Sequence, residues 1–335
     1  MNDDTDTMLP ATRAPDHVPT KLEQLAAIPE EEIWLKKQKS KRTERAYQRD
    51  VRHFMGTLGI TSVEELRQSD HRAVIAWEHY MREVEKTKNT TIRRRLSALS
   101  SLFQHLVRHG YATLNPVREI KRPEINTEEG STLAFSKAQA RALLDAPKIT
   151  TAEGAPLTGA KLIRGLRDRA ILSVGLQVGL RRAEIAALKV GDLHQNRGFH
   201  SLRVTRKRGR QDSLAIHQQT AARLSDYLIA AGHGPDLDGP LFRPFRNNGK
   251  RQDKQRSISP EMVARIVRAY AAGIGLDRDY SAHSMRATFI TTALENGAML
   301  EDVQKAAGHR HPSTTKLYDR RGYNPERAAS FFATY

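Results

Sequence analysis

The amino-acid sequence predicts a mainly α-helical protein with one small β-sheet, divided into two domains. Apolar residues recur at helical spacing through most of the chain, which is typical of amphipathic helices. The spacing changes to two residues only after Gly191 and Asp192. Between the helical parts, residues 115–132 combine two prolines with charged residues and a Glu-Glu-Gly sequence, a composition typical of an interdomain linker. At 335 residues, the chain is long enough to bury two hydrophobic cores.

The first part of the chain is expected to hold a flexible tail and a helical bundle. Residues 1–28 mix Asp, Thr, Pro and Ala with little apolar periodicity, so we expect them to be flexible. Residues 29–120 are expected to form the first domain. Its helices begin near Ser40, Asp70 and Asn89, and each carries an apolar stripe.

Residues 121–132 are the expected linker, and residues 133–335 are the expected second domain. Within that domain, Ser136 and Ser259 stand where helix N-caps are typical. Residues 168–178 form an apolar stretch that predicts a buried helix.

A β-hairpin is predicted inside the second domain. Leu202 and Val204 alternate with polar residues on the first strand, and Leu214 and Ile216 do so on the second. Between them, residues 207–210 read Lys-Arg-Gly-Arg, so the hairpin has a basic tip.

The charge of the chain is strongly basic. The 55 Lys and Arg residues against 38 Asp and Glu residues give a formal net charge of +17. A fold does not require such an excess, so it indicates a polyanionic partner, of which nucleic acid is the favoured one. Charge that serves solubility is the alternative, although it more often takes the form of mixed signs near balance.

Two clusters of basic residues are candidate DNA contacts in the first part of the chain. Arg93, Arg94 and Arg95 lie at the start of the third predicted helix, where the positive end of the helix dipole favours phosphate. Lys121 and Arg122 lie at the start of the linker.

The composition argues against several other kinds of site. Cysteine is absent, which excludes disulfides, thiolate metal sites and a cysteine nucleophile. Thirteen histidines leave a His/carboxylate site possible, but no His-x-x-x-His pair on a helical stretch has a glutamate beside it in the sequence, so we expect no metal site. We also find no Gly-rich phosphate loop ending in Gly-Lys-Ser/Thr, and we expect no cofactor.

The sequence also gives no sign of a membrane. No apolar run approaches the ~20 residues of a membrane span, and the acidic, polar N-terminus is unlike a signal peptide. We therefore expect a soluble, cytoplasmic protein.

The chemistry-bearing residues are concentrated in residues 283–318. His283 and Arg286 form a His-x-x-Arg pair, a Gly-His follows with His309, and Tyr318 stands nine residues after that histidine. A helical run and a proline-marked turn separate these residues. Two bases, an arginine and a phenol from consecutive short elements are expected to face one phosphate.

A second candidate lies upstream, where Gly-Leu-Arg-Arg-Ala-Glu follows the apolar helix. Arg181 suits a phosphate because its planar guanidinium donates two parallel hydrogen bonds to two oxygens. Glu184, three residues later, is placed to reach back and brace it. Taken in isolation, the segment is better read as a surface arginine with a helical ion-pair partner.

Taken in order, these motifs resemble those of the tyrosine recombinase, or phage-integrase, family. They are Gly-Leu-Arg-x-x-Glu at 179–184, a lysine in a basic hairpin tip, His-x-x-Arg at 283–286, and Gly-His at 308–309 with a tyrosine nine residues on. The resemblance covers roughly residues 30–335. It implies an N-terminal helical core-binding (SAM-like) bundle and a mixed α/β catalytic domain, which grip DNA as a C-shaped clamp.

The resemblance implies a role for each residue at a motif position. Tyr318 would attack the scissile phosphate and leave a 3′-phosphotyrosine and a free 5′-hydroxyl. Arg181 and Arg286 would hold the non-bridging oxygens, and His309 would bond a phosphate oxygen. His283 would assist removal of the tyrosine proton or donate a hydrogen bond to the phosphate. The chemistry agrees, since a phenol with an ordinary pKa near ~10 needs positive neighbours and a base to attack at neutral pH.

The resemblance also implies a lysine that protonates the leaving 5′-oxygen. Lys207 is the favoured candidate because it is the residue at the hairpin tip that gives up a proton easily. Arg206, Arg208 and Arg210 crowd the same tip and are expected to contact DNA. A slip in the register of the hairpin would change this assignment.

The implied partner is a double-stranded DNA recombination site. The protein would bind one site as a dimer and two sites as a homotetramer, and it would exchange strands through a Holliday junction without metal or ATP. The segment with Phe331 and Phe332 is expected either to dock onto a neighbouring protomer or to pack on its own domain. The protein would act in the cytoplasm, at the nucleoid, for a mobile element or replicon. The alternatives are a type IB topoisomerase-like enzyme and a catalytically idle, sequence-specific DNA-binding protein.

Overall fold

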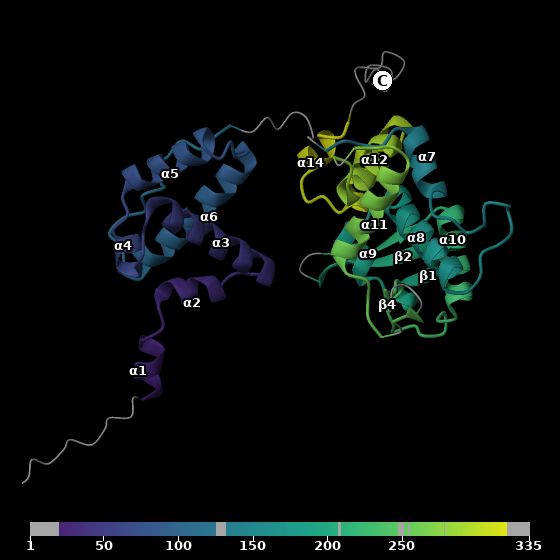
Figure 1. Ribbon diagram of the computed structural model, residues 1–335, viewed down its shortest axis with the longest axis horizontal. Helices are drawn as coiled ribbons and strands as arrows, with labels where there is room; N and C mark the ends of the chain where they lie inside the picture. Colours follow the sequence, from purple (N-terminus) through teal and green to yellow (C-terminus); the bar gives the residue numbers. More distant parts are fainter. Residues whose placement is uncertain are drawn as a thin grey trace, which may run out of the picture. The chain divides into compact units, whose positions relative to one another are not determined.

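The chain folds into two compact units, Met1–Asn126 and Thr127–Tyr335, drawn in Figure 1. The division falls inside the stretch predicted to be the linker, although the exact domain boundaries stay a prediction. The structure is a computed structural model, and it describes residues 20–124, 132–206, 209–246, 251–253, 255–277 and 279–319.

The N-terminal unit is a bundle of α-helices. The helices are α1 (Lys21–Ala26), α2 (Glu30–Lys36), α3 (Lys41–Leu58), α4 (Val63–Arg67), α5 (His71–Glu83) and α6 (Asn89–Arg108). The predicted helices near Ser40, Asp70 and Asn89 correspond to α3, α5 and α6. The Ser40 hydroxyl accepts the backbone N–H of Thr43 at 3.1 Å and thereby satisfies one of the free donors at the start of α3.

The core of this unit is built around α6, which packs against α2, α3 and α5. Trp34 of α2 is buried, and its indole N–H donates to the hydroxyl of Ser101 on α6 at 3.1 Å. Trp77 of α5 is fully buried, and its ring meets Phe54 edge to face. These contacts bind the helices into one hydrophobic core.

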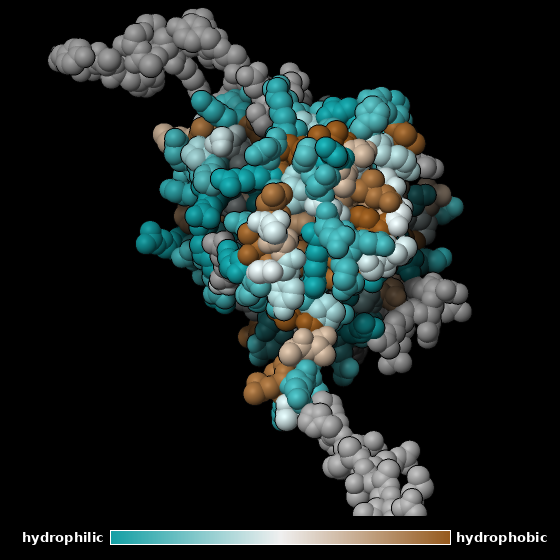
Figure 2. All heavy atoms as spheres, turned by 90° about the vertical axis from the view of Figure 1, so that its left-hand side faces the viewer, coloured by the Kyte–Doolittle hydropathy of each residue, from teal (hydrophilic) through white to brown (hydrophobic). Residues whose placement is uncertain are grey.

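The stretch predicted to be a flexible tail, residues 1–28, contains the short helix α1 at its end. The Thr20 hydroxyl accepts the Glu23 N–H at 3.2 Å, and the Glu23 carboxylate accepts the Thr20 N–H at 2.7 Å, which together form a capping box. None of the residues of α1 is buried. Figure 2 shows hydrophobic side chains exposed over α1, at the lower end of the molecule; Leu22 and Leu25 are among them. Local capping, rather than packing, therefore accounts for this helix. Residues 1–19 lie outside the described residues.

The C-terminal unit is mostly helical, with a small sheet. Its helices are α7 (Lys137–Asp145), α8 (Gly159–Gln177), α9 (Arg182–Ala187), the 3₁₀ turn η1 (Val190–Asp192), α10 (Gln218–Ala231), α11 (Pro260–Gly273), α12 (Ala282–Glu295), α13 (Leu300–Ala307) and α14 (Pro312–Lys316). The central helix is α8, which is buried along most of its second half and packs against α7, α10, α11 and α12. The N-caps predicted at Ser136 and Ser259 are confirmed for α7 and α11.

The main sheet has three antiparallel strands in the order β1 (Leu193–Asn196), β2 (Phe199–Thr205) and β3 (Gln211–Ala215). Leu202 in the middle strand pairs with Leu193 on one side and Leu214 on the other. The predicted hairpin is thus confirmed as β2 and β3, and β1 is a strand that we did not predict. A short pair, β4 (Phe245–Arg246) and β5 (Arg251–Gln252), forms a second, two-stranded sheet.

The last described helices form a small core of their own. Ile290 and Leu294 of α12 pack with Val303 and Ala307 of α13, and Tyr318 packs against this cluster. The segment with Phe331 and Phe332 lies outside the described residues. In the part of the chain that the structure describes, no helix has the length and hydropathy required to span a bilayer.

Candidate active site

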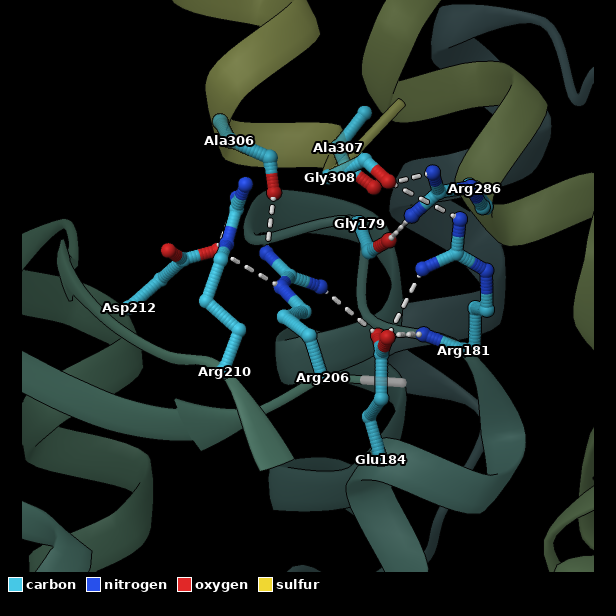
Figure 3. A network of polar contacts seen from close by, with 10 residues as sticks. All are labelled: Gly179, Arg181, Glu184, Arg206, Arg210, Asp212, Arg286, Ala306, Ala307 and Gly308. Atoms are coloured by element: carbon cyan, nitrogen blue, oxygen red, sulfur yellow. Dashed lines mark hydrogen bonds and ion pairs between the residues drawn. The ribbon is translucent and has the colours of Figure 1, made fainter. Parts of the chain in front are cut away.

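Four segments that are far apart in the sequence meet at one place in the C-terminal unit (Figure 3). They are the turn between α8 and α9, the base of the β2–β3 hairpin, helix α12, and the connection between α13 and α14. A glycine permits the approach of the first and third of these. Gly179 has a φ of +71°, and a Cβ at this position would lie 2.3 Å from the ring of Phe289 on α12.

Arg181 is the N-cap residue of α9, and Glu184 holds it in place. The Arg181 backbone N–H donates to Glu184 Oε2 at 2.8 Å, and its Nη1 donates to Oε1 at 2.7 Å. Its Nη2 donates to the carbonyl oxygen of Gly308 at 3.3 Å. The predicted brace is therefore present, and the Arg181 side chain remains 42% exposed. An arginine that is fixed at one edge and accessible at the other suits a phosphate.

Arg206 lies beside Glu184 and is buried, with only 6% of its side chain exposed. Nη1 donates to Glu184 Oε2 at 2.9 Å, Nε to Asp212 Oδ2 at 3.1 Å, and Nη2 to the Ala306 carbonyl oxygen at 2.7 Å. Arg206, which we predicted to contact DNA, keeps that role as a prediction. Its guanidinium is committed to the protein, where it connects the hairpin to α9 and to the end of α13.

Arg286 is almost entirely buried, at 1% exposure, and it joins two of the segments. Its Nη1 donates to the Gly179 carbonyl oxygen at 2.7 Å, and its Nη2 donates to the carbonyl oxygen of Ala307. Burial, followed by the positive charge of Arg181, lowers the pKa of Arg286 to about 10, so the side chain remains protonated at neutral pH.

Tyr318 lies beside His283. The hydroxyl of Tyr318 is 3.5 Å from Nε2 of His283, at the long limit of a hydrogen bond. Its backbone carbonyl oxygen accepts the hydroxyl of Thr291 on α12 at 3.3 Å. The ring also lies nearly parallel to that of His309, with centroids 6.2 Å apart. The tyrosine is thus held between the two predicted histidines.

His309 lies in the connection between α13 and α14. Gly308 ends α13 in the left-handed conformation, with a φ of +61°, and turns the chain toward the site. Nδ1 of His309 lies 2.9 Å from the hydroxyl of Thr315, which is fully buried. This contact fixes the orientation of the ring and leaves Nε2 for another partner.

The electrostatics of the site keep both histidines neutral at pH 7. Burial, followed by the charges of Arg286 and Arg181, lowers the pKa of His283 below its usual value. The same causes, in the same order, lower the pKa of His309 to about 4. For Glu184, the neighbouring arginines outweigh burial and favour the charged form. Burial raises its pKa, but the Arg181 N–H and the charge of Arg206 outweigh that effect, so the net shift is downward and the group is ionised.

Arg181, Glu184, Arg206 and His309 border a hollow of about 780 Å³ in the C-terminal unit. Its lining is strongly basic: Arg181, Glu184, Arg206, Arg210, Gln304, Lys305, Gly308, His309, Arg310, His311 and Thr314. The hollow offers many N–H donors and a single carboxylate, and that carboxylate is already paired with arginines. It is suited to an anion.

Two residues of the predicted site, Lys207 and Arg208, lie outside the described residues. Their neighbour Arg210 is described: its side chain is 65% exposed and pairs with Asp212 at 2.9 Å. The structure therefore places the base of the hairpin beside the site, and the role of Lys207 stays a prediction.

The predicted DNA contacts of the N-terminal unit have partners within that unit. Arg93 Nη1 donates to the Pro123 carbonyl oxygen (3.0 Å), Arg94 pairs with Asp50, Arg95 Nη1 donates to Glu85 Oε2 (2.8 Å), and Arg122 Nη1 donates to the Ser97 hydroxyl (2.9 Å). Arg94 remains 45% exposed, whereas Arg95 is only 17% exposed. DNA contacts by these arginines, and by the exposed Lys121, stay predictions.

Comparison with known proteins places both units in one family. Residues 135–324 match the phage integrase family, and residues 30–110 match its N-terminal SAM-like domain. The predicted fold class, a SAM-like helical bundle followed by a mainly helical catalytic domain with a small sheet, is confirmed.

Among similar sequences, the tyrosine recombinase XerC of Pelobacter propionicus is 30% identical over 82% of this chain and 82% of its own length. The tyrosine recombinase XerD of Listeria monocytogenes is 27% identical over 83% of this chain and 88% of its own length. Among solved structures, a lambda integrase dimer bound to a COC′ core site has a TM-score of 0.65 at 14% identity, covering 89% of this chain and 78% of that one. The XerH site-specific recombinase bound to its difH substrate has a TM-score of 0.57 at 17% identity, covering 80% of this chain and 72% of that one.

Proposed function

The chain belongs to the phage integrase family, and we propose that it is a site-specific DNA recombinase that cuts and rejoins DNA through a covalent 3′-phosphotyrosine. One observation carries the proposal. The Tyr318 hydroxyl lies 3.5 Å from a neutral histidine, His283, beside two arginines that the fold fixes in place. A nucleophile, a base and cationic donors are the parts that transfer of a phosphodiester requires.

In the proposed first step, the Tyr318 oxygen attacks the scissile phosphorus while its proton passes to His283. The bond between phosphorus and the 5′-oxygen breaks, and the 5′-oxygen takes a proton from Lys207. Arg181 and Arg286 stabilise the charge that develops on the non-bridging oxygens. Preorganised donors of this kind often supply the largest part of catalysis. In the second step a 5′-hydroxyl gives its proton to Lys207 and attacks the phosphotyrosine. The bond between phosphorus and the Tyr318 oxygen breaks, and the phenol takes its proton back from His283.

His309 acts in this scheme as a neutral donor. Its pKa of about 4 keeps the ring uncharged at pH 7. If the Thr315 hydroxyl donates to Nδ1, the proton of the ring resides on Nε2. That N–H is then free to donate to a phosphate oxygen in the hollow.

The proposed partner is a duplex DNA site, bound as a dimer, with a tetramer on two sites and a Holliday junction between the two rounds of strand exchange. The related lambda integrase has been solved as a dimer on a core site and as a tetramer on a Holliday junction. DNA binding should weaken steeply with rising salt concentration, because the basic side chains that contact DNA phosphates would displace counterions from them.

The experiment that tests the function begins with DNA selection. A pool of random duplexes is enriched for binding to the wild-type chain, and the selected site is then rebuilt as a nicked suicide substrate. We expect a covalent protein–DNA adduct with the wild type. Tyr318→Phe should bind the same DNA but form no adduct. An adduct that survives this substitution refutes Tyr318 as the nucleophile.

A plasmid with two copies of the selected site separates recombination from its alternatives. Deletion or inversion between the sites is expected from a recombinase. Relaxation of supercoils without rearrangement indicates a topoisomerase-like enzyme, and binding without any adduct indicates an idle DNA-binding protein.

A further inference from the structure

A cluster of metal-binding side chains lies in the N-terminal unit, outside the proposed active site. His105 and His109 are four residues apart on α6, so both project from one face of the helix at its C-terminal end. Their rings pack together with centroids 4.5 Å apart. Glu30, the first residue of α2, brings Oε2 to 2.7 Å from Nε2 of His105.

We propose that Glu30, His105 and His109 bind a Zn²⁺ ion. Each offers one donor atom, and these atoms all lie within 4.8 Å of one another. Donors around one tetrahedral Zn²⁺, each roughly 2.0–2.1 Å from the metal, lie roughly 3.3 Å apart, so small side-chain rotations bring the three to that spacing. Two imidazoles and a carboxylate form a known zinc ligand set that leaves the fourth position to water.

The surroundings of the cluster favour a cation. His105 is buried, at 7% exposure, and Glu30 is partly buried, so the fold holds two of the three donors in place. Both histidines lie at the C-terminal end of α6, where the helix dipole is negative. The neighbouring Glu31 is engaged by Arg67 at 2.9 and 3.0 Å, which leaves Glu30 as the carboxylate directed at the histidines.

The sequence concealed this site because its parts are distant. We expected no metal site because no His-x-x-x-His pair had a glutamate beside it. The fold supplies that glutamate from α2, 75 residues before His105. On binding, the metal takes the place of the hydrogen bond between Glu30 and His105.

The consequence of the site is structural. Helix α2 has seven residues and buries one of them, Trp34. At the other end of this short helix, a metal bridge would strengthen the attachment that Glu30 already makes to His105 of α6. Zinc is therefore expected to strengthen the docking of α2 on the bundle and to raise the stability of the N-terminal unit, since a ligand that binds the folded state stabilises it.

The test uses the untagged full-length chain after treatment with EDTA. Calorimetric titration with ZnCl₂ measures affinity, and titration with Co²⁺ reports coordination through its visible absorption. The variants are His109→Ala, whose side chain is exposed, and Glu30→Gln, which keeps a hydrogen bond to His105. The matched control is His79→Ala, an exposed histidine on α5.

We expect one Zn²⁺ per N-terminal unit in the wild type and in His79→Ala. Loss of an outer-shell partner weakens metal affinity by roughly 10–100-fold, so loss of a direct ligand in His109→Ala or Glu30→Gln should weaken it by at least about tenfold. The urea midpoint followed by tryptophan fluorescence should rise with zinc in the wild type and not in His109→Ala. Equal zinc affinity in the wild type and both ligand variants, or no binding by the wild type, overturns the proposal.

Discussion

Replacing Arg206 by methionine should destabilise the C-terminal unit far more than the same change at Arg210. Both arginines belong to the turn region of one hairpin, and both pair with Asp212. Arg206 has 6% of its side chain exposed and two further partners, Glu184 and the Ala306 carbonyl oxygen. Arg210 is 65% exposed and pairs with Asp212.

The expected magnitudes follow from burial. Removing one partner of a buried ion pair costs roughly 3–5 kcal/mol, because the other charge stays buried without its full complement. In Arg206→Met, Glu184 keeps Arg181 alone, and the carbonyl oxygen of Ala306 loses its donor. An exposed pair such as that of Arg210 is worth roughly 0–1 kcal/mol. With an m-value of about 2–3 kcal/mol/M, the urea midpoint should fall by roughly 1–2 M for Arg206→Met.

The two tryptophans make the assay selective. Trp34 and Trp77 both belong to the N-terminal unit, so their fluorescence follows that unit and serves as an internal control. The circular dichroism signal reports the unfolding of both units, so the unfolding transition of the C-terminal unit is measured from it. Equal midpoints for the two variants would refute the view that Arg206 is a structural link between the hairpin, α9 and α13.

A second measurement separates the charge of Arg206 from its packing. Its positive charge is one of the causes that lower the pKa of His309, after burial and the charges of Arg286, Arg181 and His283. The pKa of His309 should therefore rise in Arg206→Met and change little in Arg206→Lys, as followed by NMR titration of the imidazole. An unchanged pKa in Arg206→Met would show that this charge does not act on the site.

Three further predictions concern the same unit. Its stability should fall as the pH drops from about 6.5 to about 4, because His309 takes up a proton at a higher pH in the unfolded chain than in the folded one. The urea midpoint should therefore fall less with pH in His309→Asn than in the wild type, and an identical dependence of the midpoint on pH would contradict this. Arg286→Lys should slow adduct formation on the suicide substrate by roughly 10²–10³-fold, since lysine lacks the planar fork, and an unaltered rate would argue against Arg286 as a phosphate donor. Gly179→Ala should lower the urea midpoint more than Gly198→Ala, because a Cβ at 179 would lie 2.3 Å from Phe289 and a Cβ at 198 would meet nothing within 4 Å. Both glycines have a positive φ, so equal losses would show that the φ alone, and not the contact with Phe289, causes the loss.

Local signals accounted for much of the fold, because caps and periodicity act within a few residues. Asp70, Ser136 and Ser259 were identified as helix starts, and each side chain does accept a backbone N–H at its helix start. Helix α2 was missed because seven residues with one buried side chain show no period. Helix α10 was also missed, although it carried a signal. Ala221, Leu224 and Leu228 recur at helical spacing and are buried.

The burial of Arg206 has a physical reason that the sequence already contained. In β2, side chains alternate between the two faces of the sheet, so Leu202 and Val204 lie on the buried face. Continuing the alternation by two residues puts Arg206 on that same face, just beyond the end of the strand. Its charge suggested a solvent-exposed contact, but the period of the strand indicated burial. What the sequence could not supply is the pair of acids that makes burial possible, because Glu184 reaches Arg206 from another element.

The balance of charge around Glu184 explains why an anion site contains a carboxylate at all. Three guanidinium groups, those of Arg181, Arg206 and Arg286, surround one ionised glutamate, and bringing them together without it would leave three like charges in a poorly solvated space. Glu184 offsets one of these charges and fixes Arg181 through two hydrogen bonds. Asp212 pairs with both Arg206 and Arg210, so Arg181, Arg206, Arg210 and Arg286 together with the two carboxylates keep a net charge of +2. This balance matches the two negative charges that a phosphodiester carries when a fifth oxygen adds to it. The carboxylate therefore positions the arginines while leaving the site complementary to the proposed transition state rather than to the ground state, which carries a single negative charge.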